Sequence, residues 1–214
     1  MTSTSSAQSK DGPYEDQATN VIYQLLFCDR LDLFKENHTA ELQPPWSTLF
    51  ADNPDPAALL EIAEDSHQES RVRMLAFNSL RASGHAAPKG EYLGTIIEVR
   101  LGEGLDTLAV FADGGARYLN YSGKMVVVEG MPSPFDSEIN DVIQASKPIV
   151  AAIGPWDKER LPPPQEGNIR MSFLVSDGLY FGEGPMNAMQ REPLAAPLVS
   201  SATKLLLRLV DNSG

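Results

Sequence analysis

The sequence predicts an α+β protein whose centre is an antiparallel β-meander. Between residues 91 and 129, four runs rich in β-forming residues are separated by three glycine-containing turns, a pattern typical of consecutive antiparallel strands. The segments on both sides of the meander have apolar residues at helical spacing. Because strands and helices occupy separate stretches of the chain, this order favours an α+β fold over a parallel α/β sheet.

The strand predicted over residues 105–112 indicates that both faces of the meander are covered. Alternate residues of a strand point to opposite faces, and here Leu105 and Phe111 share one face while Leu108 and Val110 share the other. A half-exposed sheet would alternate apolar and polar residues instead. We therefore expect helices from both ends of the chain to pack on the meander, rather than a meander curled around its own core.

The turn after this strand sets its predicted pairing. Asp113-Gly114 has the sequence of a two-residue type I′ hairpin turn, in which glycine takes a positive φ. Tyr118 is expected to face the core, and Arg117 to lie at the edge or surface. The register that follows is Leu108 opposite Leu119, Ala109 opposite Tyr118 and Phe111 opposite Ala116.

The chain is expected to begin with a disordered tail over residues 1–14, which are small and polar, followed by a single α+β domain over residues 15–214. The first part of that domain, residues 15–87, is predicted to be helical. A first helix would begin at Glu15, and the residues from Asp29 to Phe34 would extend it or form a short second turn. Residues 37–53 are predicted to form a loop that Trp46 anchors to the core.

Two further helices are predicted ahead of the meander. Asp55 and Pro56 are typical of a helix start, with aspartate as the cap and proline in the first helical position. The segment Ser66–Glu69 has the sequence of a capping box that would open the next helix, and Gly84 stands just past its end. The two helices would form an αα-hairpin.

Residues 133–212 are predicted to form a helix, a hairpin and a last helix. Pro148 kinks or ends the first of these, so residues 149–153 are either helix or strand. Asp177-Gly178 predicts a second hairpin turn, and its strands could extend the meander into one six-stranded sheet. The last amphipathic helix would run from about Leu198 to Val210.

Charge and cysteine content exclude several partners and compartments. The net charge is −12, and an acidic surface repels the phosphates of nucleic acids and anionic membranes. No apolar run approaches the length of a transmembrane helix, and the amino terminus lacks the apolar segment of a signal peptide. Cys28 is the single cysteine and is expected to be a buried, reduced thiol. These observations predict a cytoplasmic protein.

No residue pattern predicts a catalytic, metal or cofactor site. Nucleophile-elbow, phosphate-loop and dinucleotide motifs are absent, and the three histidines have no partner at metal-ligand spacing; they are His38, His67 and His85. Two Gly-Glu-Gly triplets begin at Gly102 and Gly182. Their glutamates are expected to be exposed, whereas general-acid catalysis needs apolar surroundings. We predict no cofactor and no catalytic residue.

Two tryptophans beside prolines are the best candidates for binding. Trp156, with the nearby Tyr180 and Phe181, is predicted to form a binding surface, and Trp46 is a second candidate, because tryptophan is enriched in interfaces. The sequence thus favours a non-enzymatic module that binds a protein partner or itself. One alternative is an enzyme or small-molecule-binding protein with a pocket between the meander and the helices. Another is an acidic inhibitor of a basic effector, which the net charge alone supports.

Overall fold

The computed structural model describes residues 12–102 and 104–212. Within these ranges the chain forms eight helices and one six-stranded antiparallel sheet, which confirms the predicted α+β class. The helices are α1 Gln17–Leu25, α2 Leu31–Asn37, α3 Trp46–Leu49, α4 Pro56–Glu64, α5 Ser70–Ala82, α6 Asp136–Ala152, α7 Met186–Met189 and α8 Ala195–Asp211. The strands are β1 Tyr92–Leu101, β2 Gly104–Phe111, β3 Ala116–Leu119, β4 Met125–Val128, β5 Asn168–Val175 and β6 Gly178–Pro185.

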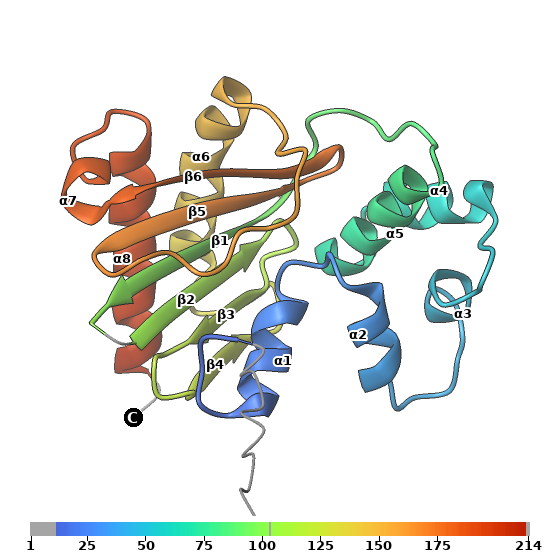
Figure 1. Ribbon diagram of the computed structural model, residues 1–214, viewed down its shortest axis with the longest axis horizontal. Helices are drawn as coiled ribbons and strands as arrows, with labels where there is room; N and C mark the ends of the chain where they lie inside the picture. The colour runs from blue at the N-terminus through green and yellow to red at the C-terminus, as the bar shows by residue number, and fades with distance from the viewer. Residues whose placement is uncertain (1–11, 103, 213–214) are drawn as a thin grey trace, which may run out of the picture.

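The strands lie in the order β4-β3-β2-β1-β5-β6 (Figure 1). The meander strands are neighbours in sequence order, and the late hairpin joins them beside β1, which confirms the six-stranded sheet. The turn of that hairpin is Ser176-Asp177, one residue earlier than predicted. In Figure 1, α6 and α8 lie behind the sheet, α1 lies in front of it, and α2 to α5 extend to the right.

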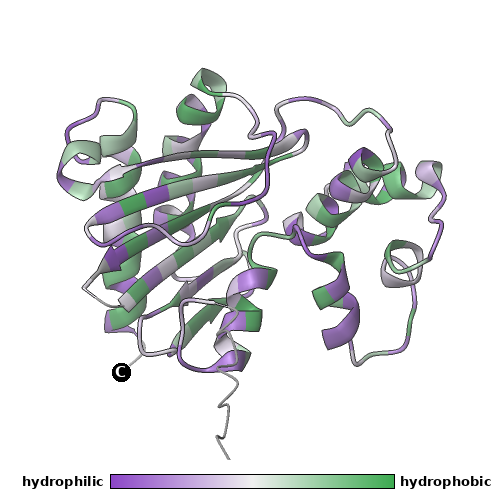
Figure 2. Cartoon of the chain, in the orientation of Figure 1, coloured by the Kyte–Doolittle hydropathy of each residue, from purple (hydrophilic) through white to green (hydrophobic). Residues whose placement is uncertain are grey.

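Each face of the sheet carries its own hydrophobic core, as the strand pattern predicts. We call the face toward α1–α5 the front face and the one toward α6 and α8 the rear face. The front core includes Tyr23, Phe27, Phe77, Ile96, Ala109 and Phe111. The rear core includes Leu108, Val110, Val142, Phe173, Leu198 and Leu205. Figure 2 shows these hydrophobic residues distributed through the strands and the helices that cover them.

The turn between β2 and β3 differs from the predicted two-residue hairpin. The backbone N–H of Phe111 donates to the carbonyl of Gly115 (2.9 Å), so residues 112–115 connect the strands. The carboxylate of Asp113 accepts the N–H of Gly115 (2.9 Å). Gly114 has a φ of +86°, the positive value expected of it. The aspartate side chain therefore closes a longer turn than the glycine alone would.

The longer turn shifts the pairing of β2 with β3 by one residue. The observed pairs are Thr107 with Leu119, Leu108 with Tyr118, Ala109 with Arg117 and Val110 with Ala116. The predicted register was wrong, because it assumed that only two residues connect the strands. The burial of Tyr118 is confirmed.

The packed part of the chain begins ahead of the predicted boundary. Tyr14 is buried, and its hydroxyl donates to Thr107 on β2 (2.9 Å). Asp16 then caps α1. Residues 1–11 of the predicted tail lie outside the described residues.

The start of α5 corrects one prediction. Asp55 caps α4 as expected, accepting the N–H of Ala57 (3.3 Å). The capping box at Ser66–Glu69 was wrong, because α5 begins after it, at Ser70. The β2–β3 turn supplies the acceptor instead. The Asp113 carboxylate accepts the N–H of Ser70 (2.7 Å), and the Ser70 hydroxyl accepts the N–H of Asp113 (3.0 Å). This reciprocal contact joins α5 to the sheet.

Pro148 lies inside α6, which continues to Ala152. Proline cannot donate to the carbonyl four residues earlier, which here belongs to Gln144, an exposed residue. The helix nevertheless continues through the proline. Residues 149–152 are therefore helical, which settles the alternative that the sequence left open.

Candidate functional site

The structure brings together two of the four aromatic residues predicted to bind. Trp156 packs edge-on against Phe181 of β6, with ring centroids 5.0 Å apart. Tyr180 is buried in the rear core, because neighbouring residues of a strand face opposite ways. Trp46 lies elsewhere, at the start of α3, where its ring stacks on that of Phe34.

The loop before β5 holds Trp156 against the edge of the sheet. Its backbone N–H donates to the carbonyl of Leu179 on β6 (2.7 Å), the bond that a further strand would make. Its indole N–H donates to the carbonyl of Glu159 (2.9 Å). A Cβ placed on Gly178 would lie 3.0 Å from the Cβ of Pro155. The loop and the hairpin are therefore in close contact, and the indole has a fixed position.

A cleft of about 600 Å³ lies beside this indole, between the β5–β6 turn, α5 and the α1–α2 connection. We call it the Trp156 cleft. It is lined by Phe27, Asp29, Arg30, Met74, Asn78, Arg81, Trp156, Lys158, Glu159, Arg160, Leu174, Asp177, Gly178 and Leu179. Three of these side chains belong to the front core: Phe27, Met74 and Leu174. The rest of the lining is largely polar, with seven charged residues among the fourteen.

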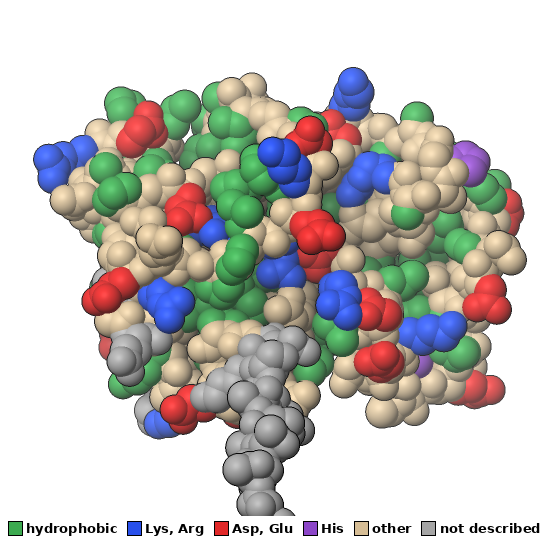
Figure 3. Space-filling model, in the orientation of Figure 1, with side chains coloured by type: hydrophobic (Ala, Val, Ile, Leu, Met, Phe, Trp, Pro, Cys, Tyr) green, Lys and Arg blue, Asp and Glu red, His purple; other side chains and the backbone are tan. Residues whose placement is uncertain are grey.

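The charges around the Trp156 cleft differ from those of the whole chain. Its lining contains four basic residues, Arg30, Arg81, Lys158 and Arg160, and three acidic ones, Asp29, Glu159 and Asp177. The local balance is therefore slightly positive, while the chain carries a net charge of −12. Figure 3 shows basic and acidic side chains interleaved along the boundary between the sheet and the amino-terminal helices.

Arg160 ties the Trp156 loop to the amino-terminal helices. Its Nε donates to the Asp29 carboxylate (2.7 Å), and its Nη2 donates to the Gln24 side-chain oxygen. The guanidinium carbon lies 3.9 Å from the centroid of the Phe27 ring, within the range of a cation–π contact. The Asp29 carboxylate thus already neutralises the charge of Arg160.

Arg81 and Lys158 carry charges that no carboxylate neutralises by an ion pair within the described chain, whereas Arg30 pairs with Asp32 (2.5 Å). Arg81 donates to the carbonyl of Ser176 and to a side-chain oxygen on its own helix. Burial lowers the pKa of its guanidinium. The Lys158 ammonium lies 5.4 Å from the centroid of the Trp156 ring. Lys158 is exposed and can meet the anionic group of a ligand, while Arg81 also interacts electrostatically with Asp177 of the same lining.

A bend at Cys28 places Asp29 and Arg30 at the rim of the cleft. Cys28 has a φ of +55°, a value that no other non-glycine residue of the described chain shares, and such a conformation costs about 1–2 kcal/mol. The side chain of Asn78 on α5 donates to its carbonyl (2.5 Å). The thiol is free and buried, as predicted. Burial raises its pKa to about 12, so it is a poor nucleophile.

A second group of polar residues is buried in the front core. One oxygen of Glu98 accepts the Tyr23 hydroxyl (2.6 Å), and the other lies 3.9 Å from Arg170 with no hydrogen-bond partner in the part of the chain described. Burial raises the pKa of Glu98. Arg170 pairs with Glu183 (2.6 Å). Glu183 is the glutamate of the Gly-Glu-Gly triplet that begins at Gly182, and the expectation that it is exposed was wrong. The glutamate of the triplet that begins at Gly102 lies outside the described residues.

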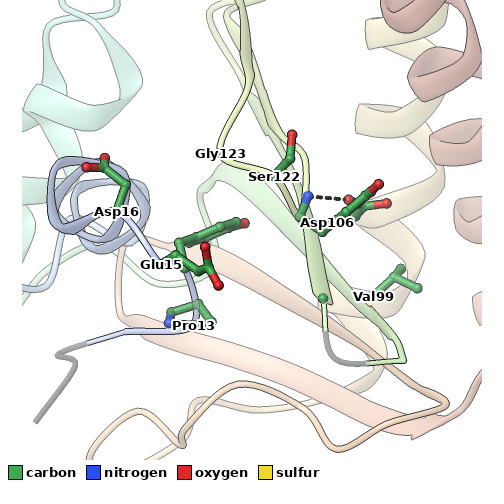
Figure 4. A pocket seen from close by; sticks show the side chains of 10 residues that line it. Pro13, Glu15, Asp16, Val99, Asp106, Ser122 and Gly123 are labelled. Carbon is green, nitrogen blue, oxygen red and sulfur yellow. Dashed lines mark hydrogen bonds between the residues drawn. The ribbon is translucent and has the colours of Figure 1, made fainter.

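A larger cavity, of about 770 Å³, lies between the start of the described chain and the β3–β4 turn (Figure 4). Two of its three carboxylates bind backbone groups of the chain itself. Asp106 accepts the N–H of Tyr121 (2.8 Å), and Asp16 accepts the N–H of Thr19 (2.7 Å). Its described lining includes no basic residue. Since the Trp156 cleft offers more unpaired groups, we take it as the candidate site.

Neither a metal centre nor a known relative guides the assignment. In residues 12–102 and 104–212, no group of three or more histidine, cysteine, aspartate or glutamate residues could hold a metal ion. None of the described helices is long and apolar enough to cross a membrane. Comparisons with protein families, with curated proteins and with solved structures found no match. The function is therefore argued from the geometry of the cleft.

The sequence pointed to Trp156 and Phe181, which the structure places in contact, and gave no motif for the cations around Trp156. Arg30, Arg81 and Arg160 come from separate segments of the chain, so no local spacing indicates that they meet. One signal was present. Lys158 and Arg160 closely follow Trp156 in a proline-rich loop of an otherwise acidic chain.

Proposed function

We propose that the protein is a binding module that holds an acidic peptide segment of a partner protein in the Trp156 cleft. The observation that carries this proposal is the presence of two cations, Arg81 and Lys158, that line the cleft without ion-pair partners among the described residues. A carboxylate that binds them breaks no existing ion pair. Charge-assisted hydrogen bonds to such groups are among the stronger contacts in interfaces.

An acidic peptide suits this cleft better than a nucleic acid does. A net charge of −12 repels a polyanion, whereas a short peptide segment brings only a few charges into a locally positive cleft. Trp156 is partly exposed and offers aromatic surface for the side chains between the acidic ones, and tryptophan often dominates the energy of an interface. The single buried, unpaired cysteine supports the cytoplasm as the compartment.

A small carboxylate-bearing ligand is the second candidate. The volume of about 600 Å³ favours it, because small-molecule sites have this size. It would use the same two cations, so the experiment has to separate the two kinds of ligand.

The fluorescence of Trp156 reports on binding in this cleft. The chain contains two tryptophans, so Trp46→Phe leaves Trp156 as the only source of tryptophan emission. A short Trp-free peptide of alternating glutamate and leucine should change this emission with saturation. Its affinity should fall as salt is added, because salt screens the exposed charges. A lysine–leucine peptide is the charge-reversed control and should not bind.

Two charge reversals assign the binding to the cleft. Lys158→Glu should weaken peptide binding by about three- to tenfold, as loss of a rim charge does. Lys147→Glu changes an exposed lysine on α6, behind the sheet, and should leave binding unchanged. No saturable signal, or equal affinity for both variants, would refute the proposal. Binding of free glutamate alone, sensitive to Lys158→Glu, would transfer it to the small-ligand candidate.

A further inference from the structure

We infer that two copies of the chain associate through β4, so that their sheets join edge to edge. β4 lies at one end of the strand order and pairs only with β3. The Trp156 cleft lies at the other end, beside the β5–β6 turn. The two surfaces are therefore separate, and this inference does not depend on the proposed peptide binding.

The hydrogen-bond pattern leaves outward backbone groups on β4. In an antiparallel pair, alternate residues bond to the neighbouring strand and the others point away from it. The N–H of Asn120 donates to the carbonyl of Lys124 (2.9 Å), so the next bonded pair includes Val126. The N–H and C=O groups of Met125 and Val127 therefore point outward. No other described segment makes a backbone hydrogen bond to them.

The two edges of the sheet differ in how they are protected. Natural edge strands carry charges, prolines or a covering loop that prevent pairing with another chain. β6 has all three: Glu183, Pro185 and the loop whose Trp156 N–H bonds to the strand. Among residues 12–102 and 104–212, β4 has none of these, and its sequence is Met-Val-Val-Val. Met125 and Val127 are 44% and 39% exposed. The described part of the chain thus leaves one edge open to pairing.

The occupant that fits this edge is a second copy. Residues whose backbone groups point away from β3 must pair with the equivalent residues of the second copy. A two-fold axis at Val126 places Met125 of one copy opposite Val127 of the other. Self-pairing thus matches the exposed side chains of Met125 and Val127 with one another, whereas an unrelated peptide would have to supply the complement.

Charge gives the association a salt dependence of its own. Each copy carries a net charge of −12, which opposes association at a distance, while the contact itself is flanked by one lysine and one glutamate, Lys124 and Glu129. Salt screens the long-range repulsion and leaves the apolar contact intact. Self-association should therefore strengthen as salt is added, opposite to peptide binding in the Trp156 cleft.

Sedimentation equilibrium of the full chain tests the inference. The native chain should show a monomer–dimer equilibrium, and Val127→Lys should weaken it by about tenfold or more, because each copy then places a charge in the contact. Leu207→Lys alters a 56% exposed leucine on α8 and is the matched control. A monomeric native chain would overturn the inference, as would an undiminished Val127→Lys dimer. Thermal unfolding of each variant shows that it is folded.

Val126→Cys tests the register. Residues opposite each other in a non-hydrogen-bonded pair have Cα atoms about 4.5 Å apart, which a disulfide can span. Mild oxidation should convert this variant to a covalent dimer. The native chain, whose Cys28 is buried, and Leu207→Cys should remain uncrosslinked. A variant that still dimerises but does not crosslink would exclude β4 pairing about Val126 and overturn the inference.

Discussion

Replacing Asp113 by alanine tests the contact that joins α5 to the sheet. The carboxylate accepts the N–H groups of Ser70 (2.7 Å) and Gly115 (2.9 Å). Loss of a helix cap costs about 1 kcal/mol, and loss of the second bond about 1–1.5 kcal/mol. Ser70 is buried, so its N–H would also lose access to a substitute. We expect the free energy of unfolding to fall by about 2–3 kcal/mol.

Urea and thermal unfolding measure this loss. For a chain of this size, each kcal/mol lowers the Tm by about 2–4 °C, so the Tm of Asp113→Ala should fall by roughly 4–12 °C. Asp113→Asn keeps an acceptor oxygen and should recover part of the loss. Asp52→Ala is the control, because Asp52 is exposed and should change stability little.

A double-mutant cycle shows whether the two residues act as one contact. Ser70→Ala removes the hydroxyl that accepts the N–H of Asp113 (3.0 Å). Residues in direct contact couple by about 0.5–3 kcal/mol, so the double variant should lose less stability than the sum of the single ones. If the free energy of unfolding of Asp113→Ala falls by less than about 0.5 kcal/mol, the range of ordinary surface changes, Asp113 does not act as the cap of α5.

Three further substitutions test other parts of the structure. Gly114→Val should lower the free energy of unfolding, measured in urea, by about 1–2 kcal/mol, because a branched residue must adopt a φ of +86° there. Gly154→Val, with open space around it, is the control. Equal losses of stability in the two variants would contradict the assignment of Gly114 to a turn. Glu98→Gln should gain stability relative to the native chain as pH rises from about 4.5. Burial raises the pKa of Glu98 from that value in the folded protein. The stability that protonated Glu98 contributes is therefore fully present below pH 4.5 and is lost as pH rises through the folded pKa. A pH-independent difference would contradict this. Trp156→Ala should abolish the peptide response, which fluorescence of a labelled peptide measures, while unfolding stays cooperative; undiminished binding would exclude the cleft.

The local rules of turns and helix starts predicted most of the fold. Asp55 caps its helix where the sequence places it, and the glycine turns mark the hairpins to within one residue. Two of the failures involve the Asp113 side chain. The Ser66–Glu69 capping box does not form, and Asp113 of the distant β2–β3 turn supplies the acceptor at the start of α5, a contact that spacing along the chain does not show. The register of the β2–β3 turn was wrong because the same side chain bonds locally to Gly115 and closes a longer turn.

The candidate site was predicted in part for the same reason. Trp156 and Phe181 were found through proline and aromatic residues, which are local features. Tyr180 faces the rear core, because alternation along a strand separates it from Phe181. Arg81 could not be found from spacing, since the fold alone brings α5 to the β5–β6 turn.

The two proposed surfaces are compatible, because they lie at opposite edges of one sheet. Four strands separate β4 from β6, so pairing through β4 leaves the Trp156 cleft open. At about 4.8 Å per strand, the outer edges of a joined sheet lie roughly 50 Å apart. A partner with two acidic segments on a long linker would bind both clefts with increased apparent affinity. Val127→Lys should therefore weaken binding of such a tandem peptide and leave binding of the single peptide unchanged. Equal affinity of the native chain and this variant for the tandem peptide would show that the clefts act singly.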